Sequence, residues 1–270
     1  MPSPSGVIAF LSDFGWRDPY AGIVRGVVES VGRGRVKVID LTHDIPPFNV
    51  IAGAYVLYTS YRYFPGGTVF LAVVDPGVGT ERKPITIETR RYFFVGPDNG
   101  ILYPAAVEDG IVEVRVIENE SVFLKPVSTS FHGRDVFAPT AVLLALGTPI
   151  EKVGRRLPLD DIARLELRDR CASEGEVRAR VVYIDVFGNV ALGLERECTS
   201  ILCAERGRVE VESRSGIFMA SCKPAFSFAE PGEMVLYNNS LGFPELAVNL
   251  GSAAEVLKTG IGDMLVLRRR

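Results

Sequence analysis

TVFLAVVDPG, at residues 68–77, decides the fold, because a continuous apolar run stops there at a polar turn. Two earlier segments repeat the arrangement: residues 7–11 end at Ser12-Asp13, and residues 36–41 end at Thr42-His43. Apolar residues at helical spacing lie between these runs, over 20–31 and 50–63. Near-continuous apolar strands that alternate with helices are typical of a parallel sheet covered by helices on both faces. The sequence therefore predicts an α/β domain with a Rossmann-like, mostly parallel sheet.

Each of the three predicted strands ends in a polar cluster that contains aspartate. Ligands of open α/β sheets bind in the crevice beyond the carboxyl ends of the strands. Asp13, Asp75 and either His43 or Asp44 are therefore candidate site residues from their position alone.

The character of the chain changes after about residue 169. Before that point, residues 84–88 and 92–95 predict a hairpin. After it, short strand-like runs are separated by Gly, Pro and Asn, which predicts a second, mostly β domain. We expect the first domain to span residues 1–170, including a linker at 154–173, and the second, smaller domain to span 171–270.

Composition narrows the class of partner. The chain has 270 residues, of which 47% are hydrophobic, and a formal net charge of −3. Without a basic field the chain is not expected to bind nucleic acid, and a small molecule is the expected partner. The sequence contains no apolar run of the roughly 18 residues that span a bilayer, and no signal-peptide pattern, so we expect no membrane association and a cytoplasmic location. We interpret the C-terminal Arg268-Arg269-Arg270 as solvated charge.

The four cysteines, Cys171, Cys198, Cys203 and Cys222, form no CxxC pair. Only two histidines could join them at a metal, so the pattern gives little support to a zinc site. We expect buried free thiols and no metal.

Two loops of the first domain could carry chemistry. Asp75-Pro-Gly-Val-Gly-Thr-Glu-Arg82 is rich in glycine, yet it is neither a dinucleotide fingerprint nor a P-loop, and a plain turn remains the alternative. His132 lies in Ser-Phe-His-Gly-Arg-Asp (130–135), just before a predicted helix. Functional groups concentrate in loops held by a rigid scaffold, which favours His132 as a site residue. We expect the competitor, His43, to form local hydrogen bonds.

Two polar clusters interrupt the second domain. They are Asp185-Val-Phe-Gly-Asn189 and the segment Asn239-Ser240-Leu241-Gly242, which is followed by Glu245 and Asn249. Alone, the first predicts a hairpin turn and the second a loop with a helix cap.

Taken together, these segments resemble the S-adenosylmethionine hydroxide adenosyltransferases, which are related to fluorinating and chlorinating enzymes that use the same substrate. The resemblance covers nearly the whole chain. It rests on the following motifs in this order: SDFG (12–15), DLTH (40–43), VVDPGVGT (73–80), GPDNG (96–100), FHGRD (131–135), DxFGN (185–189) and NSxG…AVN (239–249).

The resemblance implies a fold, an assembly and an activity. The expected second domain is barrel-like, and the expected assembly is a homotrimer whose sites lie between subunits. The activity implied is hydrolysis of S-adenosylmethionine to adenosine and methionine, with Asp75, Arg82 and His132 as the catalytic set. The fluorinating relatives carry Tyr in place of Asp75 and a halide-binding Ser in place of Gly133, so the residues here favour water as the nucleophile.

The resemblance also implies substrate contacts in the first domain. Asp13 corresponds to the carboxylate that binds the ribose hydroxyls, and Asp18 to a group near the methionine amine. Phe48 and Phe131 correspond to aromatic walls, and Gly133 lines the site.

In the second domain, the resemblance implies contacts from six residues. Asp185 is placed near the amine, and Ser240 near the methionine carboxylate, although Leu241 stands where the fluorinating enzyme has an arginine. The remaining contacts are an aromatic wall from Phe226 and adenine contacts from Asn189, Val248 and Leu250.

The chemistry sets what such a site needs. Displacement at C5′ of a sulfonium expels neutral methionine, so the reaction needs an aligned, partly deprotonated water and no acid, metal or organic cofactor. Arginine is a poor base, so Arg82 is expected to orient the water and Asp75, while Asp75 and His132 are both candidate proton acceptors. The alternatives are a halogenase, a non-catalytic S-adenosylmethionine or adenosine sensor, and a Rossmann dehydrogenase, the last disfavoured by the missing glycine fingerprint.

Overall fold

The computed structural model describes residues 2–171, 175–204 and 207–270. The chain divides into two compact units, Met1–Leu165 and Glu166–Arg270. Each unit has its own core and is described by itself.

The N-terminal unit is built on one seven-stranded sheet with the order β2-β1-β3-β5-β4-β6-β7. The strands are β1 (Val7–Ser12), β2 (Lys37–Thr42), β3 (Val69–Val73), β4 (Pro84–Thr89), β5 (Phe93–Pro97), β6 (Ile111–Val116) and β7 (Arg156–Leu157). Strands β2, β1, β3 and β5 pair in parallel, which the apolar runs predict for β1, β2 and β3. Every residue of β3 is buried, which explains why its sequence is apolar throughout.

The prediction of a mostly parallel sheet is wrong for the other half. Strands β5, β4, β6 and β7 pair antiparallel, so the sheet is mixed. The predicted hairpin at 84–95 is confirmed as β4 and β5, and it is the cause of the change. A short turn at Arg90-Arg91 can only join antiparallel neighbours, because a parallel pair needs a crossover of about a dozen residues.

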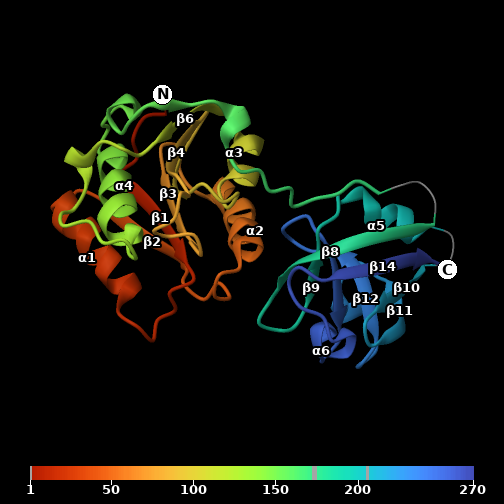
Figure 1. Cartoon of the computed structure of the whole chain (residues 1–270). Helices are drawn as coiled ribbons and strands as arrows, with labels where there is room; N and C mark the ends of the chain where they lie inside the picture. The colour runs from red at the N-terminus through yellow and green to blue at the C-terminus, as the bar shows by residue number, and fades with distance from the viewer. Residues whose placement is uncertain (1, 172–174, 205–206) are drawn as a thin grey trace. The chain divides into compact units, whose positions relative to one another are not determined.

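Helices cover both faces of this sheet (Figure 1). Helices α1 and α4 lie on one face, and α2 and α3 lie on the other. Helix α1 buries Ala21, Val24 and Val28, whose spacing places them on one side of a helix. The bounds are α1 (Tyr20–Gly32), α2 (Val50–Ser60), α3 (Tyr103–Asp109) and α4 (Ala138–Ala145), with a π-helical turn (Gly133–Phe137) before α4 and short 3₁₀ turns at Tyr61–Tyr63, Glu120–Val122, Ile150–Lys152 and Leu159–Asp161.

The C-terminal unit is a closed barrel with the order β10-β11-β12-β13-β9-β8-β14. This confirms the prediction of a β-rich second part. Its elements are β8 (Glu176–Ile184), β9 (Val190–Leu192), α5 (Glu197–Leu202), β10 (Arg208–Ser213), β11 (Gly216–Cys222), a 3₁₀ turn (Phe226–Phe228), β12 (Met234–Asn238), β13 (Pro244–Val248), α6 (Ala253–Leu257) and β14 (Met264–Arg269).

The prediction of free thiols is wrong. Disulfides join Cys171 to Cys198 and Cys203 to Cys222, and the Cα atoms of each pair are 5.7 Å apart. The second bridge ties the residue after α5 to the last residue of β11. Spacing along the chain does not reveal such pairs, because barrel closure brings together residues that are 19 and 27 positions apart.

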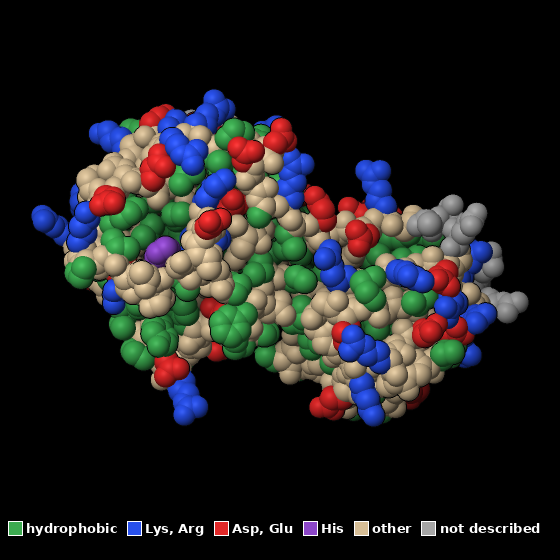
Figure 2. All heavy atoms as spheres, viewed as in Figure 1, with side chains coloured by type: hydrophobic (Ala, Val, Ile, Leu, Met, Phe, Trp, Pro, Cys, Tyr) green, Lys and Arg blue, Asp and Glu red, His purple; other side chains and the backbone are tan. Residues whose placement is uncertain are grey.

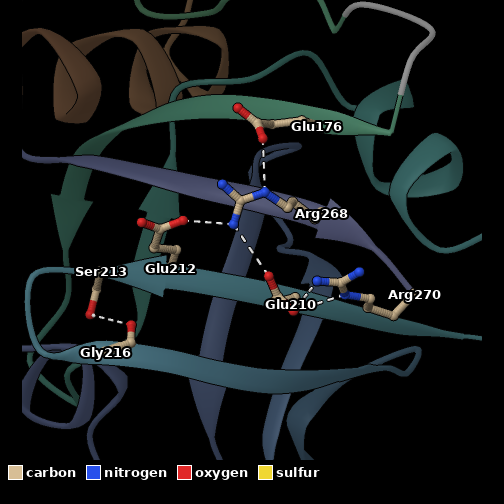
Figure 3. Close-up of polar contacts among 7 residues, drawn as sticks. All are labelled: Glu176, Glu210, Glu212, Ser213, Gly216, Arg268 and Arg270. Atoms are coloured by element: carbon tan, nitrogen blue, oxygen red, sulfur yellow. Dashed lines mark hydrogen bonds and ion pairs between the residues drawn. The ribbon is translucent and has the colours of Figure 1, made fainter.

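The C-terminal arginines also differ from the prediction of solvated charge. Arg268 donates to Glu176 at 2.8 Å, to Glu212 at 2.6 Å and to Glu210 at 3.2 Å (Figure 3). Arg270 donates to Glu210 at 2.8 Å. The cause is strand register: β14 lies between β10 and β8, with Arg268 opposite Glu210 on one side and Glu176 on the other.

Candidate active site

A cavity of about 320 Å³ opens in the N-terminal unit at the carboxyl ends of its parallel strands. It brings together seven of the predicted site residues: Asp13, Asp18, Phe48, Asp75, Phe131, His132 and Gly133. They come from the segments that follow β1, β2 and β3 and from the segment that enters the π-helical turn. The position agrees with the rule for open α/β sheets. Figure 2 shows a histidine at the surface of this unit among hydrophobic side chains.

Asp75, Arg82 and His132 form one connected group. Arg82 Nε donates to Asp75 Oδ1 at 3.0 Å, and Nη2 donates to Asp75 Oδ2. The same Nη2 lies 3.3 Å from His132 Nδ1. The side chains of Asp75 and Arg82 are each only 7% exposed. Fork-shaped arginine–carboxylate contacts of this kind fix the orientation of both partners.

One donor of this group is unused. Arg82 Nη1 is buried and has no hydrogen-bond partner among the described residues. An unsatisfied buried N–H costs free energy unless it finds an acceptor. Since Nε and Nη2 form the fork that holds Asp75, Nη1 lies on the other side of the guanidinium.

The loop from Asp75 to Arg82 is shaped by tight turns and one required glycine. Val78 N–H donates to Asp75 O at 3.2 Å, and Thr80 N–H to Gly77 O at 3.2 Å, which folds the chain back. Gly79 has φ +77°, and a Cβ there would lie 2.5 Å from Thr129 O. Only glycine permits this approach, so Gly79 lets the loop pack directly against the segment that leads to His132.

His132 immediately precedes the π-helical turn Gly133–Phe137. Such turns widen a helix locally and occur often at functional sites. A Cβ at Gly133 would lie 3.4 Å from both Phe14 Cζ and Val73 Cγ1, so the absence of a side chain keeps this wall of the cavity open.

Burial shifts the pKa of three titratable groups that line the cavity. It raises the pKa of Asp75 above its ordinary value of 3.8, although the Arg82 charge opposes the shift. Burial lowers the pKa of His132 below 6.5, and the Arg82 charge adds to that effect. Burial also raises the pKa of Asp13, with repulsion from Asp75 as a lesser cause. His132 is therefore neutral at neutral pH.

The contact with Arg82 fixes the tautomer of His132. A guanidinium can only donate, so His132 Nδ1 must accept, and the neutral ring carries its proton on Nε2. Asp75, by contrast, keeps further lone pairs on both oxygens.

Asp13 is held by the loop after β2. Its Oδ2 accepts the backbone N–H of Phe48 at 2.9 Å. Phe48 has φ +65°, a left-handed conformation that residues with a Cβ rarely adopt, and its side chain is 70% exposed. Strained, exposed aromatic residues beside a cavity are typical of ligand contacts.

The cavity has lining residues that the sequence reasoning missed: Phe14, Tyr20, Pro47, Val73, Val78 and Ser130. The Phe131 ring meets Phe14 and Tyr20 edge to face, with centroids 5.8 and 5.4 Å apart. Phe14 lies inside the SDFG motif and could have been found from it. Tyr20 begins α1 and carries no signal of its own in the sequence.

The six predicted contacts of the C-terminal unit stay predictions. Asp185 accepts from the backbone N–H of Asn189 at 2.9 Å and from its side chain at 2.8 Å, so both residues form the expected turn. Leu250 is 88% exposed, Phe226 is 46% exposed and Val248 is buried. Ser240 lies at the exposed tip between β12 and β13.

Two negative findings apply to the part of the chain that the structure describes. It contains no group of three or more His, Cys, Asp or Glu residues that could hold a metal ion. It also contains no helix with the length and apolar character needed to cross a membrane.

Comparison with known proteins places the chain in a family. The family model described as SAM hydroxide adenosyltransferase N-terminal domain matches residues 8–154, and its C-terminal counterpart matches residues 179–266. The chain belongs to this family.

Relatives of the chain match it over nearly their full length. An (R)-S-adenosyl-L-methionine hydrolase of Thermus thermophilus is 39% identical, with 93% of this chain and 94% of the relative covered. A crystal structure of a conserved protein from Thermotoga maritima superposes with a TM-score of 0.88 at 39% identity, covering 97% of this chain and all of the other. A fluorinase of Actinopolyspora mzabensis is 28% identical, with 92% of each chain covered.

The family match and the site coincide. The range matched by the N-terminal family model, residues 8–154, contains every residue that lines the cavity, and also Arg82. The C-terminal match contains all six predicted contacts of the barrel unit.

Proposed function

We propose that this enzyme hydrolyses S-adenosylmethionine to adenosine and methionine by attack of water on C5′. The observation that carries the proposal is the Asp75–Arg82–His132 group, in which Asp75 and His132 line the cavity and Arg82 contacts both. Four relatives that are 34–39% identical over nearly the full chain bear the name (R)-S-adenosyl-L-methionine hydrolase, which supports it.

The reaction needs little acid–base help beyond a positioned water. The sulfonium leaves as neutral methionine, so the leaving group takes no proton. Asp75, which lines the cavity and is oriented by the Arg82 fork, binds the water and accepts its proton as the oxygen bonds to C5′. The hydroxide equivalent then becomes the 5′-hydroxyl of adenosine.

His132 has a supporting part in this proposal. Its Nδ1 accepts from Arg82 Nη2, so it helps to hold the guanidinium against Asp75. Because that lone pair is already engaged, Asp75 is the better proton acceptor of the two candidates.

The cavity residues suit the rest of the substrate. We assign Asp13 to the ribose hydroxyls and Asp18 to the methionine amine. Phe48 and Phe131 present ring faces to the sulfonium cation, an interaction that strengthens in a dry pocket. Gly133 leaves room for the reacting carbon.

The barrel unit completes the site in this proposal. Asp185 binds the amine, Ser240 the carboxylate, and Phe226 forms an aromatic wall, while adenine is bound by Asn189, Val248 and Leu250. These contacts come from a neighbouring subunit of a homotrimer. The reaction as written uses no metal or organic cofactor, and we propose that it takes place in the cytoplasm.

The names of the relatives indicate which epimer of the substrate this enzyme prefers. The sulfonium sulfur of S-adenosylmethionine carries three different carbon substituents and a lone pair, so it exists as (R) and (S) epimers. The relatives are named for the (R) epimer. We propose the same preference here, which would let a cell remove one epimer and keep the other.

The decisive experiment uses purified protein, each sulfonium epimer separately, ¹⁸O-labelled water, and buffers with and without chloride. Mass spectrometry of the nucleoside is expected to show adenosine with ¹⁸O at the 5′ oxygen, formed faster from the (R) epimer. A 5′-chlorinated nucleoside would instead establish halogenation. Binding of either epimer without turnover would establish a sensor and contradict the proposal.

A further inference from the structure

A second polar row lies behind the cavity and takes no part in the proposed reaction. Ser12 Oγ is 2.7 Å from His43 Nδ1, and His43 Nε2 is 3.1 Å from Asp40 Oδ1. Arg25 extends the row, with Nη1 3.2 Å from Asp40 Oδ2. His43 therefore forms the local hydrogen bonds that its place at a strand end predicts.

The row has the residue types of a hydrolytic triad without its accessibility. Ser12 and His43 are both 0% exposed, so no substrate can reach the hydroxyl. The His43 ring is enclosed edge to face by Phe10 and Trp16, at centroid distances of 4.5 and 4.6 Å. A fully buried polar side chain is costly unless all its hydrogen bonds are made.

The hydrogen bonds of the row have one consistent direction. His43 Nε2–H donates to the Asp40 carboxylate, which leaves Nδ1 to accept from the Ser12 hydroxyl. The Ser12 oxygen in turn accepts the backbone N–H of Phe14 at 3.3 Å. Burial lowers the pKa of His43, which keeps the ring neutral and the direction fixed.

This row joins two loops that line the cavity. Besides the Ser12–His43 bond, the backbone N–H of Gly15 donates to His43 O at 2.7 Å. A third connection is the bond from Phe48 N–H to Asp13 Oδ2 at 2.9 Å. Asp13 and Phe14 thus lie on a segment whose flanking residues, Ser12 and Gly15, are both attached to His43.

We propose that His43 is a positioning residue, which through Ser12 fixes the loop that presents Asp13 and Phe14 and thereby sets the affinity for the adenosine part of the substrate. The proposal rests on the proposed function for the identity of the ligand. It assigns no chemical step to His43, Ser12 or Asp40, since none of them lines the cavity.

The first test is Ser12→Ala, which removes the hydroxyl and leaves the ring in place. Losing one neutral hydrogen bond is expected to weaken adenosine binding about 3- to 10-fold, measured by calorimetry, and to raise KM similarly while kcat changes less than about 3-fold. Thr140→Val is the matched control, because it deletes another buried hydroxyl. Thr140 lies in α4 and donates to Val136 O at 2.7 Å, and its substitution is expected to lower only the melting temperature.

A pair of His43 variants distinguishes the contribution of Nδ1, which contacts Ser12, from that of Nε2, which contacts Asp40. Asparagine can present an acceptor near the position of Nδ1, whereas glutamine can present a donor near Nε2. His43→Asn should therefore retain more adenosine affinity than His43→Gln, because only the former keeps the link to Ser12. The reverse order would overturn the proposal.

A double-variant cycle tests the route through Asp13. If Ser12 acts on the ligand through Asp13, Ser12→Ala should add little to the loss of adenosine affinity in an Asp13→Ala background. Full additivity would overturn that route, because it would mean that Ser12 influences binding independently.

Amide hydrogen exchange distinguishes failure of this inference from failure of the proposed function. Ser12→Ala should speed exchange at the amides of Phe14, Gly15 and Phe48, and leave those of α4 unchanged. This readout needs no ligand. Unchanged exchange at all three amides would overturn the inference even if the enzyme hydrolyses S-adenosylmethionine. Faster exchange without adenosine binding would support the link from His43 to the loop and contradict only the identity of the ligand.

Discussion

Arg82 holds Asp75 by two donors at once, with Nε 3.0 Å from Oδ1 and Nη2 on Oδ2. A lysine at this position keeps the charge but presents a single nitrogen, so the two-point contact that orients Asp75 is lost. We expect Arg82→Lys to lower kcat about 10²-fold, the cost of misplacing a reacting group by about 1 Å. Steady-state rates with S-adenosylmethionine measure it. A kcat within threefold of the wild type would contradict the role of the fork.

Conservative substitutions distinguish the two candidate proton acceptors, Asp75 and His132. Asp75→Asn removes the base and should slow turnover about 10²–10⁴-fold. His132→Asn keeps an acceptor for Arg82 near the position of Nδ1, so it should retain much more activity than His132→Ala. Equal, large losses in His132→Asn and His132→Ala would instead make the imidazole itself the base.

Activity and stability are both expected to fall on the acid side. The pKa of His132 is below 6.5 in the folded protein, so between that pKa and 6.5 the unfolded chain binds more protons than the folded one. Stability therefore decreases as the pH falls through this window, and His43, whose pKa is also lowered, adds to the decrease. Denaturant unfolding across this range checks it, with His132→Asn as a control that should flatten part of the slope.

Turnover should also fall on the acid side, as Asp75 takes up a proton. Its pKa is raised above 3.8 by burial, so the acid limb of kcat/KM should lie above the limb expected for an exposed carboxylate. A profile that follows an ordinary aspartate would contradict the assignment of Asp75 as the base.

The bridge between Cys203 and Cys222 should stabilise the barrel unit. It closes a 19-residue separation, and removing a cross-link of that size costs about 3 kcal/mol. Cys203→Ser with Cys222→Ser should therefore unfold at lower denaturant concentration than the wild type under oxidising conditions. Under strong reductant the two proteins should become equal. Reactive thiols in the denatured, unreduced wild type would show that the bridge does not form.

The glutamates around Arg268 should make the barrel sensitive to acid. Hydrogen bonds from Arg270, and then from Arg268, lower the pKa of Glu210 below 4.5. The stabilising contribution is present above 4.5 and is lost as the pH falls through the lowered pKa of the folded state. Arg268→Met should lower the melting temperature near neutral pH, because the carboxylates of Glu176, Glu210 and Glu212 then lose their shared partner. In acid, where these carboxylates are protonated, the same substitution should change the melting temperature much less. Glu195→Gln, at another partly exposed ion pair, is a matched control.

Sequence reasoning found the parts of the fold that depend on local pattern. The apolar runs identified β1, β2 and β3, and the short turn at 90–91 identified the β4–β5 hairpin. The pairing of the disulfides and the register that puts Arg268 between Glu210 and Glu176 could not be found this way. Both depend on barrel closure, which joins residues distant in sequence.

The candidate site shows the same division. Position at strand ends indicated Asp13 and Asp75, and the resemblance supplied Arg82 as their companion. The lack of a partner for Arg82 Nη1 among the described residues, the tautomer of His132 and the enclosed ring of His43 are properties of packing in three dimensions. A pattern of residue types contains none of them.

Close packing at Gly133 bears on how halide chemistry could be introduced on this scaffold. A serine there, which the resemblance gives for the fluorinating enzymes, would bring its Cβ to 3.4 Å from both Phe14 and Val73, at the near edge of ordinary van der Waals contact. The new side chain would therefore touch both neighbours, and their shape would decide where its hydroxyl points. An engineer seeking a halogenase from this chain should vary Phe14, Val73 and Asp75 together with Gly133.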